Sequence, residues 1–285
     1  MPQNQEANTS QRIKVSRMHL TLSPVRTTRK AAAHARSASQ PCHHSHPALA
    51  RLDGGVRELR SWSASASSSG MSSGSGLALV EAVLVALEEL LAAPRAAVAL
   101  HDADDQVLEG FLALADAYST FGSALLAAKQ SVAEARAGVR RGDGAMLAAS
   151  VCAHRRTEKE LCHLAATMRH ATVASSRPAG VTTDTEVVDV VAEAAVAIAE
   201  ASAVVFLGCA AMSPGVSAVV HTLSSRKWLA RLGVVLADRK VVPQTAVAAL
   251  EELEECIGAV ESGSEKVFRK LLQARVLLLN IHNPL

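Results

Sequence analysis

Residues 250–281 read LEELEECIGAVESGSEKVFRKLLQARVLLLNI, and this stretch decides the fold. Its seam positions recur every three or four residues over almost five heptads, the spacing of one helix face. The seam consists of Leu250, Leu253, Ile257, Val260, Ser264, Val267, Leu271, Ala274, Leu278 and Ile281. A helix cannot bury such a stripe alone, so the stretch predicts a long amphipathic helix packed on other helices.

Similar stripes precede this helix along the chain. Pro94 stops the first of them, and Gly142 and Gly144 end the longest, where Asp143 can cap the next helix. Thr183 with Glu186 forms a capping box before a helix that runs toward the break at Ser213. The expected helices cover residues 77–93, 104–139, 145–172, 183 to about 212, and 250–281.

The predicted fold class is all-α, an antiparallel bundle of long helices. Hydrophobic residues make up 49% of the 285 residues but aromatic residues only 2%, so Ala, Val and Leu must build the core. Because short breaks join the first two long helices, an antiparallel bundle within one chain is the economical arrangement. A coiled-coil homodimer is the alternative.

Composition divides the chain into four predicted parts. Residues 1–46 are expected to form a disordered basic arm, and 47–62 a short docking helix with apolar residues at helical spacing. Residues 63–76 are almost all Ser, Gly and Ala, which predicts a flexible linker. The helical bundle domain is expected to cover 77–285, with Trp228 and Leu232 as anchors before its last helix.

Charge is distributed unevenly. Residues 1–52 hold eight Lys or Arg and one acid, a net +7, which leaves −5 for residues 53–285 of the total of +2. Such an arm can contact an anionic membrane surface or an acidic partner, or act as an organelle transit peptide. The simplest interpretation is a solvated tail. We expect no specific nucleic-acid binding, because the arm lacks aromatic residues for base stacking.

The five cysteines form no CxxC pair, which indicates a reducing compartment. We therefore expect a cytoplasmic protein, with a plastid or a peripheral membrane location as alternatives. The most apolar segment, 194–220, is interrupted by Glu200, Ser202, Ser213 and Pro214. A buried helix is favoured there over a membrane span, which needs about 20 nearly uninterrupted apolar residues.

Both ends of the chain are similar to a known family. The N-terminal residues that carry the resemblance are His34-Ala35-Arg36-Ser37, Ser45-His46-Pro47 and the segment 52–60. The C-terminal ones are the quoted run at 250–257, Phe268-Arg269-Lys270-Leu271-Leu272 and the segment 275–281. From about His34 to Asn283 the chain resembles a plant-specific family related to the BYPASS proteins. The resemblance implies an all-helical protein whose relatives are linked to root and shoot development, with no established enzymatic activity.

Motifs that carry chemistry are weak in this sequence. The run Gly70-Met71-Ser72-Ser73-Gly74 matches G-x-S-x-G, but no strand precedes it as a nucleophile elbow requires. Gly74-Ser75-Gly76 lacks the remaining residues of a dinucleotide or phosphate loop. The acidic residues Asp104, Asp105 and 251–255 are interpreted as a solvated helix face. We predict no catalytic residues and no cofactor.

The sequence contains two groups of potential metal ligands. Cys42, His43, His44 and His46 crowd into five residues of the arm, and a structural zinc site usually needs two separated ligand pairs on a fixed frame. Cys152, His163 and His170 have spacings that place them on one helix face. Neither group is predicted to be a metal site.

The sequence favours a non-enzymatic helical scaffold that binds a protein partner. The runner-up is a membrane-associated regulatory protein that docks through its basic arm or the apolar helix at 194–220. An enzyme that modifies a small molecule is the third hypothesis, and it would require a dry pocket with converging polar groups.

Overall fold

The computed structural model describes residues 47–69, 73–101, 106–174, 183–212 and 241–283. Within these residues the chain forms seven helices and no strand, as the all-α prediction requires. The helices are α1 Pro47–Ser69, α2 Ser73–Leu91, α3 Pro94–His101, α4 Gln106–Arg141, α5 Gly144–Ala174, α6 Thr183–Ala210 and α8 Val241–His282. The predicted arm, the break at Ser213 and the anchors Trp228 and Leu232 lie outside the described residues.

A tight turn joins α4 to α5, which run antiparallel. Gly142 has a φ of 69°, a left-handed conformation that glycine adopts without steric cost. Asp143 Oδ1 then accepts hydrogen bonds from the backbone N–H of Ala145 at 2.9 Å and of Met146 at 3.1 Å. The predicted cap of α5 is confirmed, because these bonds satisfy N–H groups of its first turn that have no partner within the helix.

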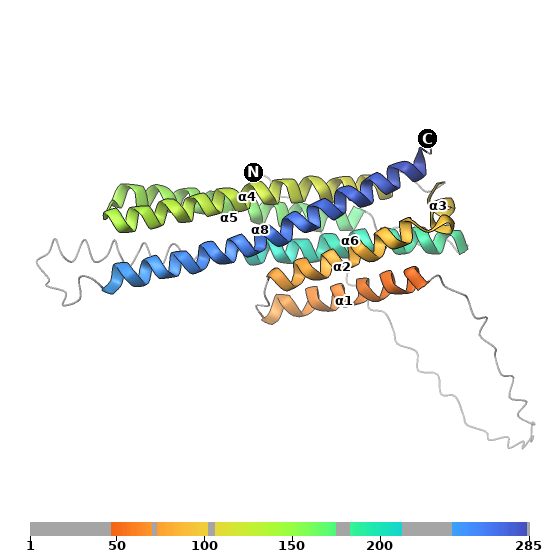
Figure 1. The fold of residues 1–285 in the computed structure, drawn as a ribbon, viewed down its shortest axis with the longest axis horizontal. Helices are drawn as coiled ribbons and strands as arrows, with labels where there is room; N and C mark the ends of the chain where they lie inside the picture. The colour runs from red at the N-terminus through yellow and green to blue at the C-terminus, as the bar shows by residue number, and fades with distance from the viewer. Residues whose placement is uncertain (1–46, 70–72, 102–105, 175–182, 213–240, 284–285) are drawn as a thin grey trace, which may run out of the picture. The chain divides into compact units, whose positions relative to one another are not determined.

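The long helices α4 and α8 lie side by side and antiparallel (Figure 1). Ion pairs join Lys129 to Glu261 at 2.8 Å, Arg136 to Glu254 at 2.8 Å and Arg140 to Glu251 at 2.9 Å. Residue numbers rise along α4 as they fall along α8, which fixes the opposite directions of the two helices. The acidic run at 251–255 was expected to face only solvent, but two of its members bind α4.

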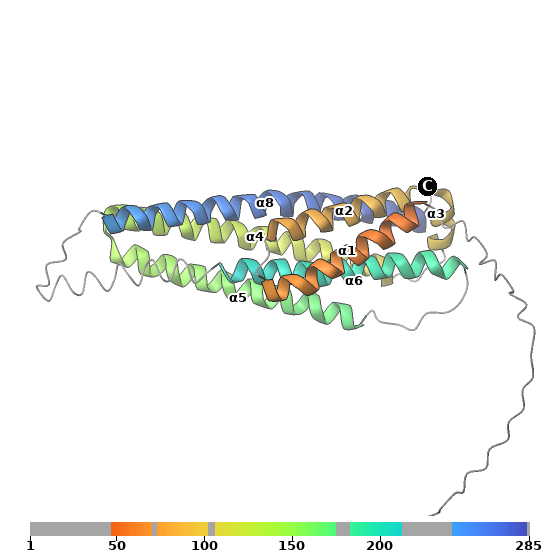
Figure 2. The same ribbon diagram turned by 90° about the horizontal axis from the view of Figure 1, so that it is seen from below.

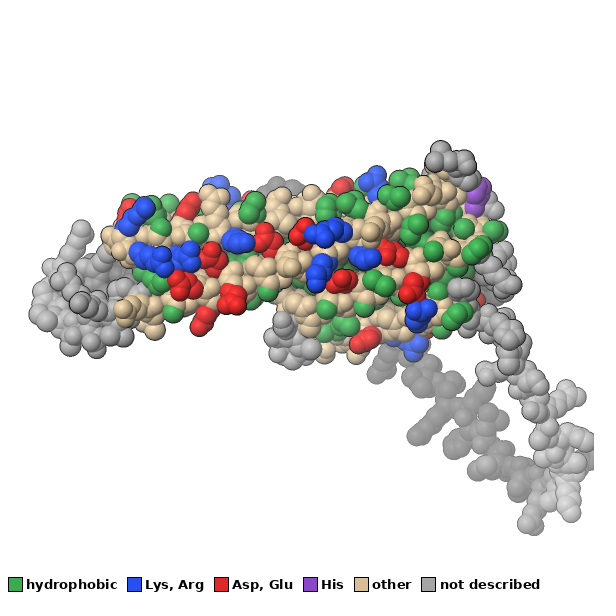
Figure 3. Space-filling view, in the orientation of Figure 1, with side chains coloured by type: hydrophobic (Ala, Val, Ile, Leu, Met, Phe, Trp, Pro, Cys, Tyr) green, Lys and Arg blue, Asp and Glu red, His purple; other side chains and the backbone are tan. Residues whose placement is uncertain are grey.

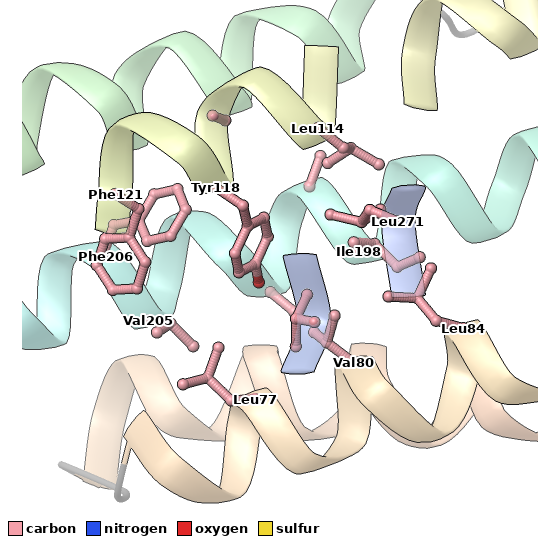
Figure 4. Close-up of a cluster of buried hydrophobic side chains, with 14 of the residues drawn as sticks. Leu77, Val80, Leu84, Leu114, Tyr118, Phe121, Ile198, Val205, Phe206 and Leu271 are labelled. Atoms are coloured by element: carbon pink, nitrogen blue, oxygen red, sulfur yellow. The ribbon is translucent and has the colours of Figure 1, made fainter. Parts of the chain in front are cut away.

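Seam residues of α8 point into the core, as the heptad pattern predicts. Eight of the ten seam residues are buried, and the other two, Leu253 and Ile281, are partly buried. Leu271 is fully buried and lies close to Leu84 of α2, Leu114 of α4 and Ile198 of α6 (Figure 4). The C-terminal helix is therefore a central element of the bundle.

An aromatic cluster joins α4 to α6 in the same core (Figure 4). The ring centroids of Phe121 and Phe206 are 4.3 Å apart, and those of Tyr118 and Phe206 are 5.6 Å apart in an edge-to-face arrangement. All three side chains are buried. Such pairs contribute about 0.5–1.5 kcal/mol beyond the area that they bury.

The segment predicted to be a flexible linker is mostly helical, so that prediction is wrong for residues 63–69 and 73–76. Trp62 of α1 is buried, and its indole N–H donates to Ser75 Oγ of α2 at 3.2 Å. A Cβ atom at Gly76 would lie 2.2 Å from the Trp62 ring. Small residues occur here because α1 and α2 pack closely. Composition alone does not distinguish a close helix contact of this kind from a flexible linker.

The three prolines of the described residues lie at the starts of helices rather than inside them: Pro47 in α1, Pro94 in α3 and Pro243 in α8. The helix α2 ends at Leu91 and α3 begins at Pro94, so Pro94 is the first residue of a new helix. Similarly, Pro243 lies in the first turn of α8, where the missing N–H breaks no helical hydrogen bond. The last helix therefore begins nine residues before the quoted seam, at Val241.

Candidate functional site

Of the two groups of potential metal ligands, the structure describes the one on α5. Cys152, His163 and His170 are all exposed on α5. Among the described residues, no group of three or more His, Cys, Asp and Glu side chains could hold a metal ion. Residues 42–46 and 70–72 lie outside the described part of the chain, and Ser73 is the first residue of α2.

A buried hydroxyl pair ties α4 to α6. Tyr118 Oη lies 2.9 Å from Ser202 Oγ, and Ser202 donates its own proton to the Ile198 carbonyl at 2.6 Å. Tyr118 is therefore the donor of the pair. Burial raises the pKa of the Tyr118 phenol well above its usual value, although the hydrogen bond to Ser202 opposes this. The phenol remains protonated near neutral pH and acts as a structural donor.

A second buried polar pair ties α4 to α5, and it was not predicted from the sequence. His154 Nδ1 lies 2.9 Å from Ser131 Oγ, and Ser131 donates to the Ala128 carbonyl at 2.7 Å. Since the hydroxyl has one proton, Nδ1–H of the imidazole is the donor. Burial lowers the pKa of His154, and the nearby Glu158 opposes this shift.

A small cavity of about 10 Å³ lies beside His154. Its lining includes Leu161, Cys209 and Met212, and its volume has room for about one water molecule. Burial raises the pKa of the Cys209 thiol to about 12, so this thiol is not an activated nucleophile. The cavity is too small for a metabolite.

An open depression lies at one end of the bundle, and we name it the end groove. It has a volume of about 410 Å³. The residues that line it are Leu91, Ala97, Val98, His101, Leu277, Asn280 and Ile281. Val98 is 75% exposed, and Val276 next to the lining is 55% exposed. Hydrophobic side chains gather at this end, near α3 and the C-terminus of α8 (Figure 3).

Comparison with known proteins gives a family match over most of the helical part of the chain. The family model described as Protein BPS1 matches residues 76–281. The chain belongs to the BPS1 family. The match confirms the family resemblance over residues 76–281, from α2 to α8; α1 and the N-terminal residues of the resemblance lie outside the matched region. No similar curated protein and no similar solved structure is found.

Among the described residues of this BPS1-family chain, two helices are long and apolar enough to cross a membrane, by length and composition alone. They cover Val107–Arg141 and Glu186–Ala210. About half of each apolar window is buried against other helices, and the Tyr118–Ser202 hydrogen bond joins the two. The segment 194–220, for which the sequence favours a buried helix over a membrane span, is described by the structure only as far as Met212.

We expect His154 to make the stability of this BPS1-family bundle depend on pH. The pKa of the imidazole is lowered by folding, so below the unfolded value of about 6.5 the unfolded chain binds more protons than the folded one. The contribution of neutral His154 to the free energy of unfolding is fully present above that value and is lost as pH falls toward the folded pKa. Urea unfolding at about pH 7.5 and about pH 5 measures this loss.

A matched variant isolates this residue from the other histidines. His154→Asn keeps a donor near the position of Nδ1 but cannot titrate, so the loss of unfolding free energy between the two pH values becomes smaller in the variant. Cys209 does not interfere, because its thiol stays neutral over this range. An identical pH dependence in both proteins would show that His154 is not protonated on unfolding.

Proposed function

We propose that this BPS1-family protein is a non-enzymatic helical scaffold that binds a protein partner in the end groove. The observation that carries the proposal is the combination of a depression of about 410 Å³ with the exposed side chains of Val98 and Val276. Contiguous apolar surface of this kind is typical of interaction sites in folded proteins. An apolar side chain that enters the groove is removed from water without any rearrangement of the core.

The charges near the groove define the chemistry of the partner. Residues 266–282 contain Lys266, Arg269, Lys270 and Arg275 and no acidic residue. Lys270 pairs with Glu88 of α2, but Arg275, next to Val276, takes part in no ion pair among the described residues. The partner segment that fits is an amphipathic helix with apolar residues on one face and acidic residues beside them, bound as a helix in a groove.

A reducing compartment, such as the cytoplasm, is part of this proposal. Cys152, Cys162 and Cys256 are exposed free thiols, and Cys209 is a buried one. Such thiols persist where disulfides are kept reduced. A role in root and shoot development is likewise proposed only from the family resemblance.

Proximity labelling in plant cells tests the proposed function. The protein carrying both Val98→Glu and Val276→Glu places two charges at the groove, where a bound apolar segment would leave them without water. We expect the labelling of direct partners to fall at least about tenfold, since truncation of a central contact costs over 1 kcal/mol and 1.4 kcal/mol is tenfold.

The control is Leu126→Glu, at a 60% exposed position on α4 that does not line the groove. It should leave the labelled set unchanged, and circular dichroism should show that all the variants are folded. Labelled sets that are the same for wild type and the groove variant would overturn the proposal. Turnover of a small molecule by the purified protein would also overturn it, in favour of an enzyme.

A further inference from the structure

The helix α5 lies at the edge of the bundle (Figure 2). It packs mainly on α4 and α6 through Leu147, Leu161, Ala165 and Met168, which are buried. The opposite side of the helix is exposed from Cys152 to His170. We name this side the outward face of α5; its exposed residues include Cys152, Arg155, Arg156, Lys159, Cys162, His163, Ala166, Thr167 and His170.

The outward face carries positive charge that the rest of the fold does not use. Arg155, Arg156 and Lys159 are exposed within two turns, and none of them takes part in an ion pair among the described residues. Glu160 is the one exposed acid between residues 152 and 170. By contrast, Lys129, Arg136 and Arg140 of α4 all pair with carboxylates of α8. Basic residues that join α4 to α8 are thus paired, while Arg155, Arg156 and Lys159 of α5 take part in no ion pair among the described residues.

The shape and chemistry of this face fit a flat anionic surface. From Arg155 to His170 the helix extends over about 22 Å, at 1.5 Å per residue. The exposed residues of this face other than Arg, Lys and His are small, such as Cys152, Ala166 and Thr167, so no large apolar side chain is available to insert or to anchor a protein partner. We propose that the outward face of α5 binds the anionic headgroups of phospholipids and holds this helix against a membrane surface without insertion.

Two other polyanions fit the face less well. An acidic protein would bind through charge alone, because the aromatic and large aliphatic residues that dominate protein interfaces are missing from the face. Nucleic acid finds no aromatic side chain among the exposed residues of this face on which bases can stack. A membrane needs only an accessible row of cations. Each Lys or Arg near an anionic surface raises the affinity for the membrane several-fold. The outward face of α5 is separate from the end groove, which no residue of α5 lines.

Vesicle sedimentation with the full-length protein tests the proposal. We expect binding to phosphatidylcholine vesicles only when they also contain phosphatidylserine, and release at high salt because screening shortens the range of the attraction. Replacing Arg155, Arg156 and Lys159 together by Gln should lower the partition coefficient about 100-fold. The matched control replaces Arg51, Arg57 and Arg269 by Gln. These three residues are exposed, so their replacement removes the same net charge elsewhere on the protein, and this variant should bind nearly as well as wild type.

Native cysteines report which surface touches the lipid. Cys152 and Cys162 lie on α5 beside the basic residues, and Cys256 is exposed on α8. With the anionic vesicles, alkylation of Cys152 and Cys162, measured by peptide mass spectrometry, should slow strongly, while alkylation of Cys256 should not.

Three results would overturn the proposal. The α5 variant could bind as wild type does while a variant with Arg26, Arg29 and Lys30 replaced by Gln does not, which would assign the binding to the N-terminal arm. Cys152 and Cys162 could react at their free rate on bound protein. Finally, polyglutamate could protect these thiols while vesicles do not, which would assign the face to an acidic protein instead.

Discussion

Leu271→Asp is expected to unfold the entire bundle. Leu271 is fully buried in α8, where residues of three other helices surround it. An ionised carboxylate has no partner there, and its transfer from water into an apolar core costs several kcal/mol at least. That cost is comparable with the whole stability of a typical domain, about 5–15 kcal/mol. The variant should lose its cooperative thermal transition.

Circular dichroism melts measure this effect, with light scattering to give the molecular mass. Glu252→Lys is the control, because Glu252 is exposed on the same helix and its replacement should change the stability by only about 0.5 kcal/mol. Equal melting temperatures for both variants would show that α8 is not a core helix. A folded Leu271→Asp protein that changes from dimer to monomer would support the coiled-coil alternative.

Phe206→Ala is expected to lower the unfolding free energy by about 3–5 kcal/mol. The ring of Phe206 is fully buried between Tyr118 and Phe121, so its removal opens a cavity and breaks two aromatic contacts. The chain has seven aromatic residues, and three of them form this cluster. The cluster joins α4 to α6, so the loss should weaken the whole bundle.

Urea unfolding of wild type and variant gives the difference directly. Leu126→Ala, at an exposed site on α4, should stay within about 0.5 kcal/mol of wild type. If Phe206→Ala fails to fold, Phe206→Leu keeps most of the volume and allows a smaller loss to be measured. A change below about 1 kcal/mol for Phe206→Ala would mean that the cluster is loosely packed or formed differently.

Helical periodicity predicted most of the fold because burial follows from it. The stripes of α2, α4 and α8 are buried at the positions that the spacing selects, and the turn at Gly142-Asp143-Gly144 forms as its residues predict. These features depend on neighbours three or four residues apart, which a sequence displays. An apolar seam must pack on another helix to be buried, and α4 and α8 pack on each other.

Features that depend on contacts distant in sequence were not predicted. Composition alone makes Gly76 look like part of a flexible segment, because its contact with Trp62 exists only after α1 folds back on α2. His154 interrupts an apolar stripe, and only its pairing with Ser131 of α4 explains its burial. The end groove likewise forms from three helices, and neither Val98 nor Val276 stands out in its own segment.

The helix α8 packs on α4 and α2 within one chain, and zero-length cross-linking tests this packing most directly. A carbodiimide joins a carboxylate to an adjacent ammonium group, and two interhelical pairs have the required geometry: Lys129 with Glu261 and Lys270 with Glu88, both at 2.8 Å. Mixing isotope-labelled and unlabelled protein before the reaction separates links within a chain from links between chains. We expect both links in the monomer band, without mixed-isotope peptides. Links confined to a dimer band, with mixed isotopes, would contradict the intramolecular bundle.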